Sequence, residues 1–188
     1  MNYDVIVIGA GPGGIFSAYE LVRLNPSLKV AVFEAGHALS KRKCPIDGEK
    51  IKSCINCKTC SIMSGFGGAG AFSDGKYNIT NDFGGTLYEY LGKKQALDLM
   101  KYVDELNMRY GGEGTKLDST AGSRFKTLCI QHDLHLLDAS VRHLGTDINY
   151  IVLENLYAEL KDKVEFFFDT PVQTLKVLEE GYEVVLKD

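Results

Sequence analysis

The chain has 188 residues, 45% of them hydrophobic and 24% charged, which is ordinary for a globular protein and long enough for one domain with a large core. The formal net charge is −4, so charge gives no argument for binding nucleic acid or an anionic membrane surface. No apolar run approaches the ~20 residues that cross a bilayer, and the first run is too short for a signal peptide. We therefore expect a cytoplasmic protein.

The chain begins with a short strand and a glycine-rich turn. Val5–Ile8 is an apolar run of β-branched residues, a composition typical of a strand buried on both faces. It leads directly into Gly9-Ala10-Gly11-Pro12-Gly13-Gly14, which has the spacing G-x-G-x-x-G. Apolar residues then recur at helical spacing from residue 15, and Asn25-Pro26 ends the predicted helix.

A second strand and an acidic residue complete this pattern. Leu28–Phe33 is rich in β-forming residues, and Glu34 follows Gly14 by twenty residues. A strand, a glycine turn, a helix, a strand and a spaced acid in this order indicate a dinucleotide-binding fold. The alternative is a glycine-rich turn that binds nothing, which the complete context disfavours.

Each residue of the pattern has a physical role in the predicted site. Gly9 permits a tight turn, Gly11 lets the backbone approach a pyrophosphate, and Gly14 lets the helix pack closely on the strand. The diphosphate would then meet free N–H groups at the positive end of the helix. Glu34 can accept hydrogen bonds from ribose hydroxyls and would repel a 2′-phosphate, so NADP is disfavoured.

A cysteine-containing segment follows, within residues 37–76. The cations Lys41, Arg42 and Lys43 either contact cofactor phosphate or adenosine, or lie on a solvated loop. The next residues hold a C-x-x-C-x-x-C run preceded by a fourth cysteine, which gives the set Cys44, Cys54, Cys57 and Cys60. Four such thiolates suit a [4Fe–4S] cluster or a tetrahedral zinc. The alternatives are a reversible redox pair at Cys57 and Cys60 and inert free thiols.

A second glycine-rich stretch comes directly after the cysteines. Five glycines occur in the eleven residues from Gly65 to Gly75, which gives a backbone able to follow a flat or phosphate-bearing ligand closely. Phe66 and Phe72 argue against a flexible linker, because such linkers are rich in small polar residues.

These features together resemble one family. Glu34-Ala35-Gly36, Arg42-x-Cys44-Pro45, the spaced cysteines and the run from Gly65 to Lys76 are similar to the uncharacterised bacterial FAD-dependent dehydrogenases, which have a glutathione-reductase-type FAD domain. The resemblance covers the whole chain. It implies that the first glycine loop binds the FAD pyrophosphate, that Glu34 binds the adenosine ribose, and that Gly67–Lys76 lies along the flavin side.

The predicted fold is therefore α/β, with a Rossmann-like FAD/NAD(P)-binding domain, a parallel sheet, a β-meander and a partly helical insert. The residues predicted to contact FAD are Gly9, Gly11, Pro12, Gly13, Gly14, Glu34, Ala35, Arg42, Gly67, Gly68, Gly70, Ala71, Phe72, Ser73, Asp74, Gly75, Lys76 and Val172. The residues predicted to hold an iron–sulfur cluster or zinc are Cys44, Cys54, Cys57 and Cys60.

The insert is predicted at residues 77–162, with helices at about 93–110 and 148–160. Thr146 or Asp147 is the expected N-cap of the second helix, whose start either binds an anion or is an ordinary capped end. Leu128–Ile130 is a short apolar run in which Cys129 is expected to pack in a core. His132 and His135 have no third ligand, which favours surface positions over a metal site.

The C-terminal part predicts three strands, at 164–168, 172–177 and 182–186. The resemblance makes the first a parallel strand, makes the others the start of a β-meander, and places the backbone near Val172 at the adenine edge. FAD domains of this type return later for a last parallel strand, so we expect residues 1–188 to be an FAD-binding domain that is incomplete at its C-terminus.

The sequence leaves three functions open. The first is the FAD-binding part of an oxidoreductase that moves hydride or electrons between the flavin and a small-molecule substrate or an electron-transfer partner. The second is a nucleotide-binding fragment without turnover. The third is a module stabilised or regulated by a metal at the four cysteines.

Overall fold

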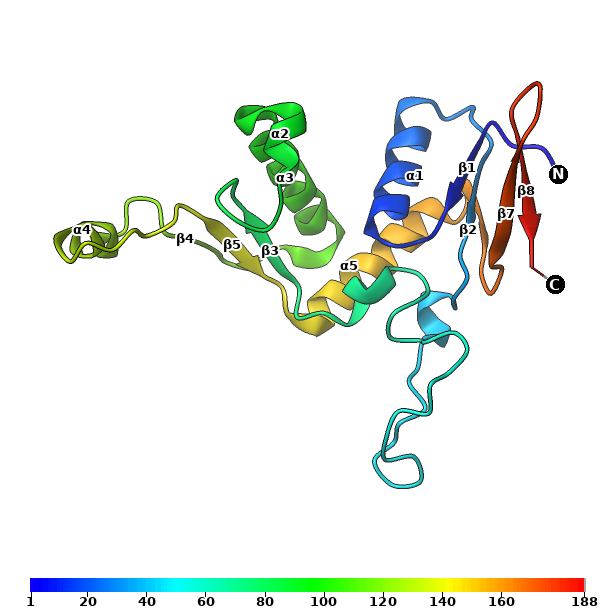
Figure 1. Cartoon of the computed structure of the whole chain (residues 1–188), viewed down its shortest axis with the longest axis horizontal. Helices are drawn as coiled ribbons and strands as arrows, with labels where there is room; N and C mark the ends of the chain where they lie inside the picture. Colours follow the sequence, from blue (N-terminus) through cyan, green and yellow to red (C-terminus); the bar gives the residue numbers. More distant parts are fainter. Residues whose placement is uncertain (188) are drawn as a thin grey trace. The chain divides into compact units, whose positions relative to one another are not determined.

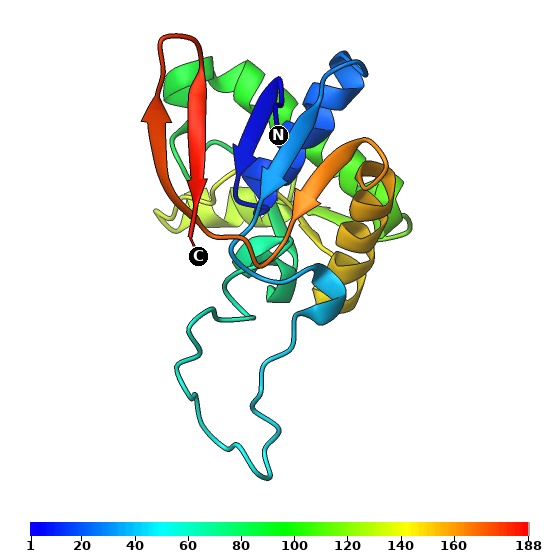
Figure 2. The ribbon, with the colours of Figure 1, turned by 90° about the vertical axis from the view of Figure 1, so that its right-hand side faces the viewer.

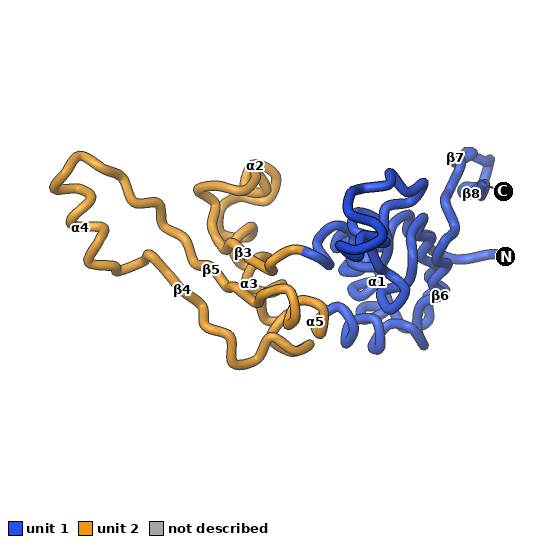
Figure 3. Tube along the Cα trace, turned by 90° about the horizontal axis from the view of Figure 1, so that it is seen from below, with its two compact units in different colours: residues 1–72, 153–188 blue, residues 73–152 orange. Residues whose placement is uncertain are grey.

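The computed structural model describes residues 1–187, which form two compact units (Figure 3). Unit 1 contains Met1–Phe72 and the described residues from Leu153 onward, and unit 2 is Ser73–Val152. Unit 2 overlaps residues 77–162, where the sequence analysis expects an insert, and that domain division stays a prediction. No helix within residues 1–187 has the length and apolar character needed to span a membrane.

Unit 1 is built on a parallel sheet with one helix between its first two strands. The strands β1 (Val5–Ile8), β2 (Val30–Phe33) and β6 (Val164–Phe167) lie in the order β1-β2-β6 (Figure 2). Val5 pairs with Val30 and Val30 with Val164, both in parallel register. The helix α1 (Pro12–Leu24) connects β1 to β2 and contacts both. The predicted α/β, Rossmann-type fold is confirmed.

The helix α1 ends where the sequence predicts, before Asn25-Pro26, and begins at Pro12. Pro12 occupies its first turn, and Asn25 caps its C-terminal end through a backbone N–H donated to Leu21. The buried residues recur at helical spacing and form the face against the sheet: Ile15, Ala18, Tyr19 and Val22.

The strand β1 differs from its predicted environment. All four residues of β2 are buried, as expected of a strand in the middle of a parallel sheet. In β1 the first three residues are half-buried and Ile8 is 55% exposed. The expectation of burial on both faces was therefore wrong for Val5–Ile8. The reason is positional, because β1 lies at an edge of the described sheet and β2 does not.

The other C-terminal strands form an antiparallel hairpin of β7 (Val172–Val177) and β8 (Tyr182–Leu186) (Figure 1). Their positions confirm the predicted strands, and β6 is parallel, as the resemblance implied, and pairs with β2. Val172 is half-buried at the start of β7.

Unit 2 contains more strand than the predicted, mostly helical insert. Its antiparallel sheet has the order β3-β5-β4. The strands of this unit are β3 (Lys76–Ile79), β4 (Leu117–Ser119) and β5 (Ser140–His143). Its complete helices are α2 (Leu87–Leu91), α3 (Lys93–Asn107) and α4 (Arg124–Gln131), and α3 continues into one π-helical turn at Met108–Gly112. The fifth helix, α5 (Gly145–Leu160), contributes residues to both units.

A buried ion pair joins helix to sheet inside unit 2. The Arg142 guanidinium donates to both carboxylate oxygens of Asp104, at 2.6 and 2.8 Å. These hydrogen bonds raise the pKa of Arg142, and burial opposes them. The anion bound by Arg142 is thus an internal carboxylate of the same unit.

Three local expectations concern this region, and two of them were wrong. The apolar run at Leu128–Ile130 lies in α4, which has no buried residue, so Cys129 is half-buried on a surface helix and not in a core. The helix α5 begins at Gly145, so Thr146 and Asp147 lie in its first turn and not at its N-cap. His132 and His135 are exposed, as predicted.

Candidate functional site

The turn between β1 and α1 has the geometry of a close approach to a ligand. Gly9 has φ +98°, a conformation that L residues rarely adopt, and its N–H donates to the carbonyl of Phe33 at 2.7 Å. A Cβ atom built on Gly11 or on Gly13 would meet no atom within 4 Å. The backbone at these two residues therefore faces open space.

Gly14 has a different role, because it faces the protein. A Cβ atom there would overlap the carbonyl oxygen of Gly9 and would lie 3.3 Å from the side chain of Val7. The absence of a side chain is what lets α1 pack this closely on the end of β1. This agrees with the role predicted for the third glycine of the pattern.

The N-terminus of α1 carries unsatisfied donors and no competing charge. Gly11 is the N-cap, no side chain caps the helix, and the first turn contains no acidic residue. The first backbone N–H that bonds within the helix is that of Ile15, which donates to the carbonyl of Gly11 at 3.0 Å. The preceding N–H groups have no acceptor within the helix. An anionic group bound beside Gly11 and Gly13 would meet these donors and the positive end of the helix dipole.

Glu34 lies at the end of β2 and is 7% exposed. Its carboxylate accepts three backbone N–H groups, from Ala10 at 2.7 Å, Gly36 at 2.8 Å and Gly65 at 2.9 Å. A carboxylate has about four lone-pair positions, so one acceptor position remains for a ligand hydroxyl. Glu34 thus ties the first glycine turn to the second glycine-rich stretch.

Sequence reasoning missed the two glycines whose N–H groups donate to the Glu34 carboxylate, Gly36 and Gly65. A Cβ atom on Gly36 would lie 2.6 Å from the carbonyl carbon of Ser64 and 2.9 Å from Cα of Gly65. Gly65 has φ +116°. The signal was present in the sequence, since one glycine comes two residues after Glu34 and the other opens the second glycine-rich stretch.

Arg42 is buried, with 6% exposure, and its guanidinium is occupied by the protein itself. Four of its five N–H groups donate to backbone carbonyls, those of Ser61, Ile62, Phe66 and Gly68, at 2.7–2.9 Å. Burial lowers the pKa of Arg42, and the charges of Glu34 and Cys60 act in the opposite direction. The alternative of a solvated cation is wrong for Arg42, while Lys41 and Lys43 are exposed.

The second glycine-rich stretch packs directly on the first through its residues in unit 1. Phe66 is fully buried, and its ring meets the rings of Tyr157 and Phe166 edge to face, at 5.2 and 5.7 Å between centroids. Gly67 donates to the carbonyl of Ala10 at 2.8 Å. A Cβ atom on Gly68 would lie 3.2 Å from Cα of Gly11. Residues Phe66–Gly68 therefore form a packed wall beside the turn. This agrees with the prediction, made from the phenylalanines, that the stretch is not a flexible linker.

The remaining predicted cofactor residues are distributed between the two units. Within unit 1, Pro12, Gly13 and Ala35 are exposed, and Gly70 and Ala71 lie in a short 3₁₀ helix, Gly68–Phe72. Ser73, Asp74, Gly75 and Lys76 begin unit 2. There Lys76 pairs with Asp74 at 2.8 Å, and the N–H of Gly145 donates to the carbonyl of Asp74. The cofactor contacts of these residues, and of Val172, stay predictions.

The four clustered cysteines are not brought together. All are free thiols, with Cys54, Cys57 and Cys60 exposed and Cys44 half-buried. Within residues 1–187 no group of three or more histidine, cysteine or acidic side chains is placed to hold a metal ion. An iron–sulfur cluster or zinc at these cysteines is therefore without structural support. The spacing of the cysteines in the chain did not predict their spacing in the fold.

This arrangement predicts the reactivity of the thiols. We expect Cys54, Cys57 and Cys60 to react quickly with a thiol reagent, because they are exposed, and Cys44 and Cys129 to react more slowly. A time course with a chromogenic disulfide reagent, followed by mass mapping, measures the order. Zinc or iron that protects Cys44, Cys54, Cys57 and Cys60 together would contradict the picture of independent thiols.

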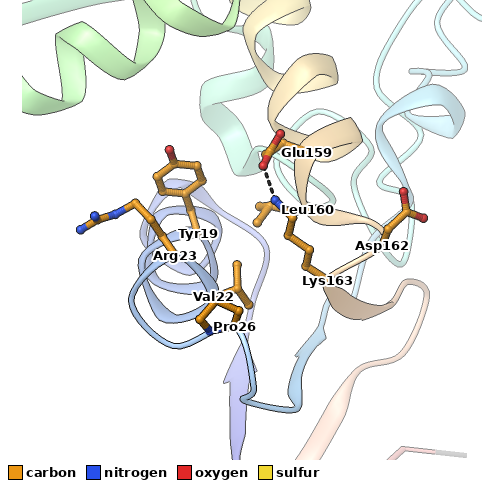
Figure 4. Close-up of a pocket in the computed structure, with 8 residues that line it drawn as sticks. All are labelled: Tyr19, Val22, Arg23, Pro26, Glu159, Leu160, Asp162 and Lys163. Atoms are coloured by element: carbon orange, nitrogen blue, oxygen red, sulfur yellow. Dashed lines mark hydrogen bonds and ion pairs between the residues drawn. The ribbon is translucent and has the colours of Figure 1, made fainter.

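A surface cavity of about 460 Å³ lies elsewhere in unit 1, between the C-terminal ends of α1 and α5 (Figure 4). Tyr19 and Val22 contribute from α1, and Glu159 and Leu160 from α5. Lys163 at its edge pairs with Glu159. The cavity lies at the opposite end of α1 from the glycine turn, so it is not part of the candidate site.

The geometry of unit 1 suits a dinucleotide. The open glycine turn and the uncapped end of α1 fit a pyrophosphate, and the free acceptor position of Glu34 fits a ribose hydroxyl.

No family model and no curated protein matches the sequence. Solved structures do resemble the chain. A glycine oxidase from Geobacillus kaustophilus is 14% identical, with TM-score 0.49, over 97% of this chain and 50% of that one. THI4 from Thermovibrio ammonificans is 16% identical, with TM-score 0.41, over 97% and 45%. The halogenase PltM in complex with phloroglucinol and FAD is 16% identical, with TM-score 0.40, over 99% and 31%. This chain thus spans half or less of the length of these proteins, and the assignment of the site rests on its own geometry.

Proposed function

We propose that this chain is the FAD-binding portion of a flavin-dependent oxidoreductase. The observation that carries the proposal is the open glycine turn at the uncapped N-terminus of α1, with the buried Glu34 at the end of the neighbouring strand. This pairing supplies donors for a diphosphate and an acceptor for a ribose, the two recognition elements of a dinucleotide.

The residues divide the work of binding. Gly11 and Gly13 leave room for the pyrophosphate, Glu34 accepts a hydroxyl of the adenosine ribose, and the wall at Phe66–Gly68 borders the turn. When bound, FAD supplies the capacity to accept or donate hydride or electrons. The protein holds and orients it, and the expected partner is a small-molecule substrate or an electron-transfer protein.

The flavin content of the purified chain tests this proposal. We expect protein purified without air to be yellow, or to take up added FAD with quenching of flavin fluorescence. The expected stoichiometry is one flavin per chain. A folded chain that neither retains nor rebinds FAD would refute the proposal.

A nucleotide-binding fragment without turnover is the second candidate. It is favoured by the site itself, because the described residues at the glycine turn and Glu34 supply donors and acceptors for binding. Under this candidate the chain binds FAD and reduces no electron acceptor. Reduction of a dye by the FAD-loaded chain with a reducing substrate would exclude it.

Substitution of Glu34 tests the ribose contact. Glu34→Gln removes the negative charge and turns an amide N–H₂ towards backbone donors, while Glu34→Arg places a cation there. Charge-assisted hydrogen bonds contribute about 1.5–3 kcal/mol each, so we expect FAD affinity to fall on the order of tenfold or more in both variants. Titration of flavin fluorescence measures the change.

The control for this prediction is Glu20→Gln on α1, which removes a surface carboxylate that pairs with Arg23 at 2.7 Å. We expect this variant to bind FAD as the wild type does. Unchanged FAD affinity in both Glu34 variants would show that Glu34 is not a ribose ligand.

A further inference from the structure

The surroundings of Arg42 are unusual for a residue expected to bind phosphate. Its guanidinium is held by four carbonyl oxygens, and its Cζ lies 4.8 Å from the centroid of the Phe72 ring. A Cβ atom on Gly65 would lie 2.7 Å from Cδ of Arg42. The side chain is thus enclosed by residues 61–72 on several sides.

The four carbonyl acceptors come from two neighbouring stretches of the chain. Ser61 and Ile62 directly follow Cys60, the last cysteine of the protruding loop at 43–60 (Figure 2). Phe66 and Gly68 belong to the second glycine-rich stretch, which packs on the first glycine turn. One guanidinium therefore closes the base of the cysteine loop and fixes the wall beside the turn.

Glu34 complements this arrangement from the other side. Arg42 binds carbonyl oxygens of residues 61–68, and Glu34 binds the N–H of Gly65 within the same stretch. Two buried side chains of opposite charge thus hold one short segment through its backbone. The segment has no regular secondary structure before Gly68, so these contacts supply the hydrogen bonds that a helix or sheet would supply.

We propose that Arg42 is a positioning residue, which shapes the wall at Phe66–Gly68 through its planar guanidinium and does not contact a cofactor phosphate. The proposal rests on the proposed function and goes beyond it, since it makes FAD affinity depend on the backbone of residues 61–68. It also links the exposed thiols at Cys54, Cys57 and Cys60 to the site, because their loop ends on the carbonyls that Arg42 holds.

The shape of the donor separates this role from a phosphate contact. A phosphate contact depends on charge, which a lysine retains, and it weakens as salt is added. The carbonyl contacts need several N–H groups at fixed directions, which the guanidinium provides and an ammonium group does not. Arg42→Lys and Arg42→Ala are therefore expected to behave alike.

The experiment compares Arg42→Ala, Arg42→Lys and the control Lys43→Ala, which removes an exposed cation of the same segment. We expect FAD affinity to fall about tenfold or more in both Arg42 variants and to change less than about twofold in the control. Limited proteolysis should cut residues 43–64 faster in both Arg42 variants. Guanidinium at millimolar concentration should restore FAD affinity and protease resistance to Arg42→Ala, and methylammonium should not.

Other results would overturn the proposal. If Arg42→Lys keeps wild-type FAD affinity, or if only the wild type loses affinity with salt, Arg42 contacts the phosphate. Should Arg42→Ala fail to fold, Arg42→Lys decides the question by the same two measurements. If the wild type binds no FAD, the proposed function fails, and the proteolysis with its guanidinium rescue still decides whether Arg42 holds residues 61–68.

Discussion

Gly11→Val is expected to abolish FAD binding while the chain stays folded. The backbone of Gly11 has φ −72° and ψ 179°, which any residue adopts, and a Cβ atom would meet no protein atom within 4 Å. The added side chain instead fills the open space at the N-terminus of α1, where the pyrophosphate is proposed to lie. Loss of two charge-assisted hydrogen bonds at about 1.5–3 kcal/mol each corresponds to a weakening on the order of 100-fold or more.

Flavin retention measured beside thermal unfolding separates binding from folding in this variant. The control is Ser17→Val, which introduces the same side chain at an exposed position of α1 away from the glycine turn. We expect the control to retain FAD and the Gly11 variant to unfold at the temperature of the flavin-free wild type. A folded Gly11→Val chain that still holds FAD would show that the pyrophosphate does not lie at this turn.

The parts of the site that depend on neighbouring residues were predictable from the sequence. The turn at Gly9–Gly14, the helix behind it and the strand before Glu34 are set by local spacing, because each glycine acts within a few residues of its own position. The second glycine-rich stretch was also recognised as packed, since Phe66 is too large and apolar for a linker. Each of these features shows in a few consecutive residues of the sequence, although in the fold Phe66 packs against the distant Tyr157 and Phe166.

The rest depended on contacts between distant segments. The three consecutive cations at 41–43 show in the sequence that this segment is positively charged. They do not show that carbonyl oxygens about twenty residues later bind the Arg42 guanidinium. Burial of β1 followed from its composition, but its place at an edge of the described sheet leaves Ile8 exposed. The four cysteines have the spacing of ligands, but among the described residues no three ligand side chains are gathered to hold a metal ion.

The strands of unit 2 were missed for a related reason. β4 has three residues, all exposed, and β3 alternates lysine and asparagine with apolar residues. Neither is long or apolar enough to be distinguished from a turn by pattern alone. Both become strands by pairing with β5, which comes later in the chain.

Gly14→Ala is expected to destabilise unit 1 even without a ligand. Its Cβ atom would overlap the carbonyl oxygen of Gly9, and this peptide group cannot move aside easily because its N–H, that of Ala10, donates to the buried Glu34 at 2.7 Å. Overpacking of this kind costs about 1–3 kcal/mol, and a backbone clash places the variant at the upper end of that range. The corresponding fall in melting temperature is about 6–12 °C for a chain of this size.

Gly13→Ala is the matched control, because it adds the same methyl group one residue earlier and meets no atom within 4 Å. Alanine is favoured over glycine within a helix by up to about 1 kcal/mol, so this variant should unfold at the same temperature as the wild type or slightly above it. Thermal unfolding of the flavin-free proteins, followed by circular dichroism, measures both. Equal melting temperatures for Gly14→Ala and Gly13→Ala would contradict this prediction. They would show that the close packing of α1 on the end of β1, which is proposed to position the N-terminus of α1 for an anion, does not require a glycine at position 14.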